Sequence, residues 1–282
     1  MKKKSRQKII KTAIDYPQSD QYASRMRCLQ ITNNRHAETA EIFSQLIKGY
    51  GTVDSSDTWA PRGPDAPAEI RIDEATGFLK SPDHKTELRN WWTAEVPGQQ
   101  TPTWDIASTC TINGVKGLLL IEAKAHIGEL NSDHSGSREK PILNQIKKGF
   151  SDATDAWNDA LHEYAEDRGF KLSHNVKLST ASHFQLSTHF AFAWKLADMG
   201  VPVILVYLGF LNVNELLDEN RIIFRHKDMW NKCVFEKTSK PLPEEIWDAT
   251  FTFNGTPLTV LRCATTVELP EPTGRVFSIA RP

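Results

Sequence analysis

The 282-residue chain has few cysteines and no long hydrophobic run. None of its four cysteines belongs to a C-x-x-C pair, which argues against a zinc knuckle or a disulfide scaffold and fits a reducing compartment. The longest apolar run, near residues 203–208, is far shorter than the roughly 20 residues of a membrane-spanning helix. No apolar segment follows the first lysines, so we expect no signal peptide, no membrane partner and a cytoplasmic location.

Two widespread catalytic signatures are also missing. The chain contains no G-x-x-x-x-G-K-[ST] phosphate loop, which argues against ATP hydrolysis by that route. It contains no G-x-S-x-G motif of the kind that carries a nucleophilic serine. What is present is ordinary for a globular protein, with 39% hydrophobic and 24% charged residues. The length suits one elaborated domain or two small ones.

The net charge of −1 conceals an uneven distribution along the chain. Residues 1–30 hold eight Lys or Arg against two Asp, a net charge of +6, so the remainder carries about −7. We interpret residues 1–33 as a basic N-terminal arm. Such an arm can contact the phosphates of a nucleic acid, here through Lys2, Lys3 and Lys4. A solvated chain end is the simpler alternative.

The hydrophobic pattern predicts helices and strands in alternation. Apolar residues recur at helical spacing over 35–48, 141–168, 182–199 and near 228–237, with Asn33 or Asn34 as a cap for the first helix. Strands are expected over 101–111, 116–125 and 201–210, and one or two short strands within 69–92.

Two Asn-Gly pairs and one helix-to-strand junction predict how the strands are connected. Asn113-Gly114 and Asn254-Gly255 each favour a tight hairpin, the second joining 250–253 to 256–263. The helix at 182–199 leads directly into strand 201–210, which is typical of a crossover connection. Strand 201–210 should therefore run parallel to strand 116–125.

Two charged residues stand at the end of an otherwise apolar strand. Leu118 to Ile121 is apolar on both faces, which indicates an interior strand, and Glu122 and Lys124 follow on one face. If Asn113-Gly114 is a two-residue turn, paired residue numbers sum to 227 and Asp105 lies opposite Glu122. Two carboxylates so placed repel each other, and Mg²⁺, with Mn²⁺ as a substitute, would stabilise both. A surface hairpin with a solvated charge cluster is the alternative, which the apolar run disfavours.

Pro102-Thr103-Trp104-Asp105, followed by a hairpin and Glu122-Ala123-Lys124, resembles the PD-(D/E)XK nuclease superfamily. The resemblance covers roughly residues 35–210, although Pro102 lies three residues before Asp105 rather than next to it. It implies a three-layer α/β/α fold with a mixed central sheet and a restriction-endonuclease-like αβββαβ core over 34–210. We expect residues 211–282 to form a C-terminal α+β extension packed on that core.

The resemblance also implies roles for individual residues. Asp105, Glu122 and the carbonyl of Ala123 would ligate Mg²⁺, and Lys124 would orient the attacking water or help to deprotonate it. Members often carry a further acid on the first helix, for which Glu38 is favoured over Glu41. The implied function is a Mg²⁺-dependent endonuclease or other phosphodiesterase acting on DNA. Cutting both strands of a duplex requires two active sites, which a homodimer would supply.

Other functions and other ligands stay open on the sequence alone. The chain could be a catalytically silent nucleic-acid-binding or regulatory module, or a metal-dependent hydrolase of a small phosphoester. His126, Glu129, Asp133 and His134 could join Glu122 in a zinc site, although a polar loop whose His126 touches substrate fits their spacing better. Gln185 and His189 lie one helical turn apart and could reach the cleft or be satisfied core residues. Trp91, Trp92 and Trp104 could stack on bases or pack in the core.

Overall fold

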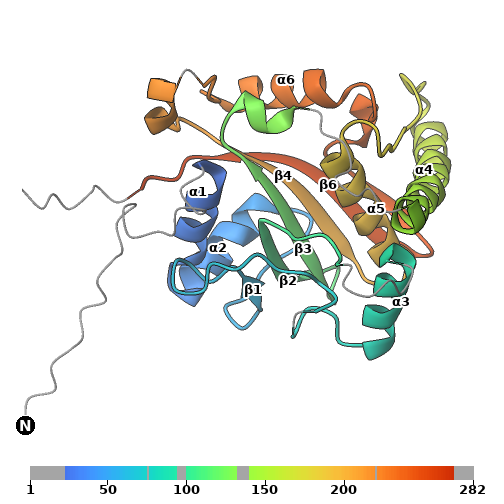
Figure 1. The fold of residues 1–282 in the computed structure, drawn as a ribbon, viewed down its shortest axis with the longest axis horizontal. Helices are drawn as coiled ribbons and strands as arrows, with labels where there is room; N and C mark the ends of the chain where they lie inside the picture. The colour runs from blue at the N-terminus through green and yellow to red at the C-terminus, as the bar shows by residue number, and fades with distance from the viewer. Residues whose placement is uncertain (1–22, 75, 94–99, 132–139, 220, 270–282) are drawn as a thin grey trace, which may run out of the picture.

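The computed structural model describes residues 23–74, 76–93, 100–131, 140–219 and 221–269. Its centre is a six-stranded mixed sheet with the strand order β1-β2-β3-β4-β6-β5 (Figure 1). The strands are β1 (Trp59–Ala60), β2 (Ile106–Ile112), β3 (Val115–Lys124), β4 (Val203–Phe210), β5 (Ala249–Phe253) and β6 (Thr256–Thr265).

Helices cover both faces of this sheet. The α-helices are α1 (Ala23–Thr32), α2 (His36–Leu46), α3 (Pro82–Thr93), α4 (Lys140–Arg168), α5 (Phe184–Asp198) and α6 (Lys227–Thr238). Three short 3₁₀ helices are η3 (Ile127–Leu130), η4 (Asn214–Glu219) and η5 (Glu244–Ile246). Within the described ranges, no helix is both long and apolar enough to span a bilayer.

The hairpin between β2 and β3 forms in the predicted register. Asn113 and Gly114 both have positive φ angles, 49° and 79°, the backbone conformation that an Asn-Gly turn favours. Ile112 pairs with Val115 and Ile106 with Ile121, so paired residue numbers sum to 227 as predicted. The same register brings Asp105, one residue before β2, to the end of β3 that carries Glu122.

The predicted crossover is also confirmed. Helix α5 leads into β4, which runs parallel to β3 with Leu118 opposite Val203 and Lys124 opposite Gly209. Every residue of β4 is buried, as expected for an interior strand. The predicted hairpin at Asn254-Gly255 joins β5 to β6.

Residues 211–282 are expected as an extension packed on the core, but their described part contributes two strands, β5 and β6, to the central sheet. β6 lies between β4 and β5 and runs parallel to β4, with Val203 opposite Leu258. Leu258, Val260 and Leu261 on β6 are buried, so this strand has apolar contacts on both faces. The sheet therefore continues past the predicted core.

Two hydrophobic cores lie on opposite faces of the sheet. One joins Leu118 and Leu120 of β3 to α3, α4, α5 and α6, with Trp157 and Phe190 among its largest buried side chains. The other joins Leu119 of β3 and the other residues on its face to α1 and α2. Figure 1 shows α1 and α2 together on one side of the sheet and α4 and α5 on the other.

Three predictions near the N-terminal half need correction. Within the expected basic arm, residues 23–32 form α1, where Cys28 and Leu29 are fully buried; Lys2, Lys3 and Lys4 lie outside the described residues. The segment 69–92, expected to hold strands, contains α3, because Pro82 suits the first turn of a helix. Arg35, not an asparagine, is the N-cap of α2.

Candidate active site

Glu122 and Lys124 lie at the carboxyl end of β3, on the face covered by α5. Alternation along the strand puts both side chains on the side of Leu118 and Leu120. Their relative exposures are only 2% for Glu122 and 8% for Lys124. Charged residues are almost never so deeply buried unless they are paired or functional. The end of β3 therefore holds a deeply buried charged pair.

Lys124 is held by two acceptors. Its Nζ donates a hydrogen bond to Oε1 of Glu122 and another, at 3.1 Å, to Oε1 of Gln185 on α5. Burial by itself would lower the pKa of Lys124, but the carboxylates of Glu122 and Asp105 raise that pKa to about 12. Lys124 is consequently a fixed positive charge at neutral pH.

Asp105 approaches β3 from the end of β2. Its Oδ2 accepts a hydrogen bond of 2.8 Å from the backbone N–H of Ala123, between Glu122 and Lys124. Burial and the neighbouring charge of Glu122 raise the pKa of Asp105 well above its ordinary value, and Lys124 opposes this only in part. The predicted proximity of Asp105 to Glu122 is thus visible both in the register and in the electrostatics.

A histidine contacts the other carboxylate oxygen of Glu122. Nε2 of His189 on α5 lies 3.4 Å from Glu122 Oε2, and Nδ1 of His189 lies 3.1 Å from the Tyr207 hydroxyl. Trp104 lies against the imidazole, with ring centroids 4.7 Å apart. Burial raises the pKa of Glu122, although Lys124 acts in the opposite direction. Gln185 and His189 therefore do reach the site, each contacting one of the predicted catalytic residues.

Two further carboxylates surround the site. Glu69 accepts a hydrogen bond of 2.7 Å from Thr103 and lies 3.3 Å from the guanidinium of Arg25. Glu129 accepts one of 3.0 Å from Ser24 and another from the backbone N–H of Ala125. The charge of Glu69 contributes to the raised pKa of Asp105, and both charges contribute to that of Glu122. The site thus has more negative than positive charge.

Other predicted residues lie apart from this cluster. Glu38 is 56% exposed, and its carboxylate accepts a hydrogen bond from the Arg35 N–H at the start of α2. Glu41, on the same helix, is also exposed. Neither helix acid is placed beside Glu122, because α2 packs against the opposite face of the sheet.

His126 lies just beyond β3 but faces the following turn. Its Nδ1 accepts from the Gly128 N–H at 3.1 Å, and its Nε2 lies 3.9 Å from Glu129. Asp133 and His134, the other members of the alternative zinc cluster, fall outside the described residues. The three tryptophans pack in the hydrophobic core or against it: Trp92 and Trp104 are buried in the core, and Trp91 packs against it.

Asp105 and Glu122 suit a hard divalent cation as carboxylate ligands. Across the described ranges, no group of three or more His, Cys, Asp or Glu side chains is arranged to hold a metal ion. Mg²⁺ often takes only one or two carboxylates, with water and substrate phosphate completing its coordination. Burial is the first cause of both raised carboxyl pKa values, and neighbouring carboxylates add to it, so such a cation would stabilise the ionised form of both acids.

A small cavity of about 30 Å³ adjoins Lys124. Gln185, Tyr207 and Asn131 are among the residues that line it. Because this volume admits about one or two water molecules, water can stand next to the lysine at this end of the sheet.

Glu69 and Tyr207 were missed by sequence reasoning. Glu69 precedes Ile70, which pairs with Trp104 through a single β-bridge, and that bridge places Glu69 beside the segment leading to Asp105. The alternation of charged and apolar residues over 69–73 was the available signal. Comparisons of the chain with family models, with curated proteins and with solved structures found no match.

Proposed function

We propose that the protein is a metal-dependent nuclease that hydrolyses phosphodiester bonds of DNA, with Asp105, Glu122 and Lys124 as its catalytic residues. The observation that carries the proposal is the gathering of two carboxylates and a lysine at one strand end, where Glu122 and Lys124 are buried and Asp105 is half-buried. Structural ion pairs balance their charges, whereas here burial and like charge raise the pKa of both acids. The helix–strand order around the site supports a restriction-endonuclease-like core.

Each of the three residues has a role that follows from its surroundings. Asp105 and Glu122 would hold Mg²⁺ together with the Ala123 carbonyl, and the bound metal would lower the pKa of water and stabilise charge on the phosphate. Lys124, fixed by Glu122 and Gln185, presents a positive charge to the phosphate oxygens. A pKa of about 12 favours this electrostatic role for Lys124 over proton abstraction.

His189 has a positioning role in this proposal. Its ring lies between Tyr207 and Glu122 and is stacked on Trp104, so the Glu122 carboxylate is held in one orientation. Gln185 does the same for Lys124 from the preceding turn of α5. Both contacts come from the helix that crosses this face of the sheet.

The test is a cleavage assay on plasmid, linear duplex and single-stranded DNA with Mg²⁺, Mn²⁺ or EDTA. We expect cleavage that requires metal and disappears in Lys124→Ala. Lys195→Ala is the matched control, because Lys195 is also half-buried between two carboxylates, Glu87 and Asp198, but near the far end of α5. Product sizes distinguish an endonuclease from an exonuclease.

The assay also separates the alternatives. Metal-dependent turnover of a chromogenic phosphodiester without DNA cleavage would replace the nuclease with a hydrolase of small phosphoesters. Salt-sensitive DNA binding without cleavage, from folded protein in either metal, would indicate a silent binding module instead. Normal cleavage by Lys124→Ala would refute the assignment of this site.

A further inference from the structure

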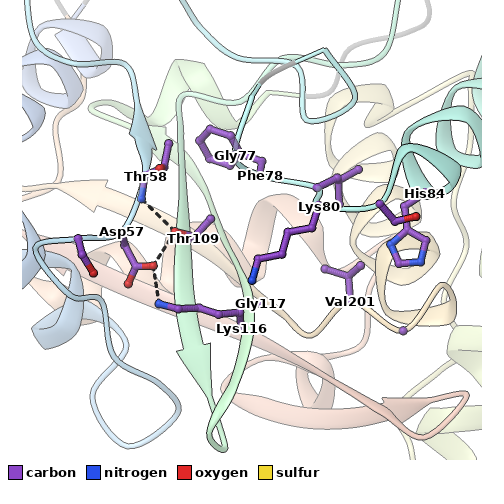
Figure 2. A pocket seen from close by; sticks show the side chains of 14 residues that line it. Asp57, Thr58, Gly77, Phe78, Lys80, His84, Thr109, Lys116, Gly117 and Val201 are labelled. Atoms are coloured by element: carbon purple, nitrogen blue, oxygen red, sulfur yellow. Dashed lines mark hydrogen bonds and ion pairs between the residues drawn. The ribbon is translucent and has the colours of Figure 1, made fainter.

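A second, larger pocket lies at the opposite end of β3 (Figure 2). It has a volume of about 400 Å³ and is lined by residues 56–58, residues 77–81 with His84, the start of β3, and Gly200 with Val201. Six residues of strand separate Lys116 in its lining from Glu122, a distance of about 20 Å. The pocket is therefore separate from the candidate active site.

The pocket combines apolar walls with a size that suits a small molecule. Phe78 and Leu79 are buried apolar residues of its lining, and Val201 adds a half-buried one. Ligand pockets commonly enclose about 300–1,000 Å³ and have mainly apolar walls with a few polar groups. A molecule of mononucleotide size fits within these dimensions.

The carboxylate that lines this pocket, Asp57, is already balanced by a lysine. Asp57 Oδ1 lies 2.7 Å from Lys116 Nζ and accepts a hydrogen bond of 2.6 Å from the Thr109 hydroxyl. Its Oδ2 accepts another, of 2.8 Å, from the Asp54 N–H. Asp57 and Lys116 thus compensate each other, and neither supplies a net charge for a ligand.

Two basic side chains remain beside this neutral pair. Within the part of the chain that the structure describes, the side chains of Lys80 and His84 form no hydrogen bond or ion pair. Figure 2 shows Lys80 extending into the pocket, with its amine directed toward the start of β3, and His84 at the side near Val201. The pocket therefore has a net positive charge next to an aromatic ring.

We propose that this pocket binds a nucleoside monophosphate, independently of the proposed nuclease activity. Lys80 and His84 would hold the phosphate, because a lysine acts as a point charge for phosphate and a histidine donates from a ring nitrogen. Phe78 and Val201 would contact the base and sugar. The compensated Asp57 lies at the far side from His84 in Figure 2, where it repels the phosphate least.

Isothermal titration calorimetry in EDTA tests the proposal, because chelation prevents metal-dependent binding at Asp105 and Glu122. The probes are adenosine monophosphate, thymidine monophosphate, adenosine and inorganic phosphate. We expect saturable binding of a monophosphate, with weaker binding of adenosine and of inorganic phosphate. Lys80→Gln should weaken the binding about tenfold or more, which is the usual effect of losing a hydrogen bond to a charged group.

Two further variants keep the test interpretable. Lys48→Gln removes the same charge from the exposed turn that follows α2 and should leave the affinity unchanged. Val201→Phe should abolish nucleotide binding by filling the pocket. The proposal is refuted if folded wild-type protein binds neither monophosphate, if Lys80→Gln and Lys48→Gln bind equally well, or if adenosine binds as tightly as adenosine monophosphate.

Discussion

Replacing Lys124 with alanine should destabilise the metal-free protein by an amount that depends on pH. Lys124 is the positive partner of Glu122, and both side chains are nearly inaccessible to water. Removing one partner of a buried ion pair leaves the other charge without compensation. Glu122 can avoid that cost by taking up a proton, so the loss of stability is limited by the cost of keeping Glu122 protonated.

The cost of keeping Glu122 protonated depends on the pH and on the pKa of Glu122 in the unfolded chain. In this limit the folded variant keeps Glu122 protonated at both pH values, whereas the unfolded chain has Glu122 near its ordinary pKa of 4.5. The charge part of the loss is therefore at most about 3.4 kcal/mol at pH 7.0 and about 0.8 kcal/mol at pH 5.0. Losing three buried methylene groups of the lysine adds about 2 kcal/mol at both pH values.

The loss of stability in Lys124→Ala should increase with pH. Because the folded variant binds a proton that the unfolded chain releases, its free energy of unfolding falls as pH rises above 4.5. Urea denaturation of wild type and Lys124→Ala in EDTA at pH 5.0 and 7.0 measures the difference. The double variant Lys124→Ala with Glu122→Gln removes this titrating group and should lose the part of the pH dependence that is due to Glu122, whereas the part due to Asp105 remains. An equal loss for Lys124→Ala at both pH values would refute the buried-pair reasoning.

Two other substitutions have clear expected outcomes. Asp105→Asn should stabilise the protein in EDTA at pH 7, because burial and Glu122 raise the pKa of Asp105 and the folded state therefore loses stability as pH rises above the ordinary value of 3.8. Mg²⁺ should raise the melting temperature of wild type but not of Asp105→Asn, and an equal rise in both would remove Asp105 from the metal site. Gly209→Ala on β4 should cost about 1–3 kcal/mol in urea denaturation, since its new Cβ would lie 2.5 Å from Trp230 of α6, and unchanged stability would contradict that packing.

The sequence predicted the site best where local chemistry determines geometry. An Asn-Gly turn admits few loop lengths, so a single assumption about Asn113-Gly114 fixed the register of β2 against β3. That register brought Asp105 to Glu122 across the hairpin. The alternation of side chains along β3 then determined that Glu122 and Lys124 share a face.

What the sequence could not predict depends on contacts between distant segments. Glu69 reaches the site because Ile70 pairs with Trp104, and the alternation over 69–73 does not show which segment this single bridge joins. β6 enters the sheet beside β4 although 45 residues separate the ends of these strands, Phe210 and Thr256. Glu38 looked suitable because of its helix, but α2 packs on the other face. Hydrophobic periodicity identifies elements and says little about which of their faces meet.

The two ends of the β2–β3 hairpin show why only one of them is assigned to catalysis. Each end holds an aspartate, Asp57 buried and Asp105 half-buried. Asp57 has a lysine, a hydroxyl and a backbone N–H as partners, which is the full set of donors that a structural carboxylate needs. Asp105 accepts its hydrogen bond from Ala123 and faces the negative charges of Glu122 and Glu69. A fold gains nothing from that repulsion unless a cation relieves it, so the uncompensated end is the one expected to bind metal and act on a phosphate.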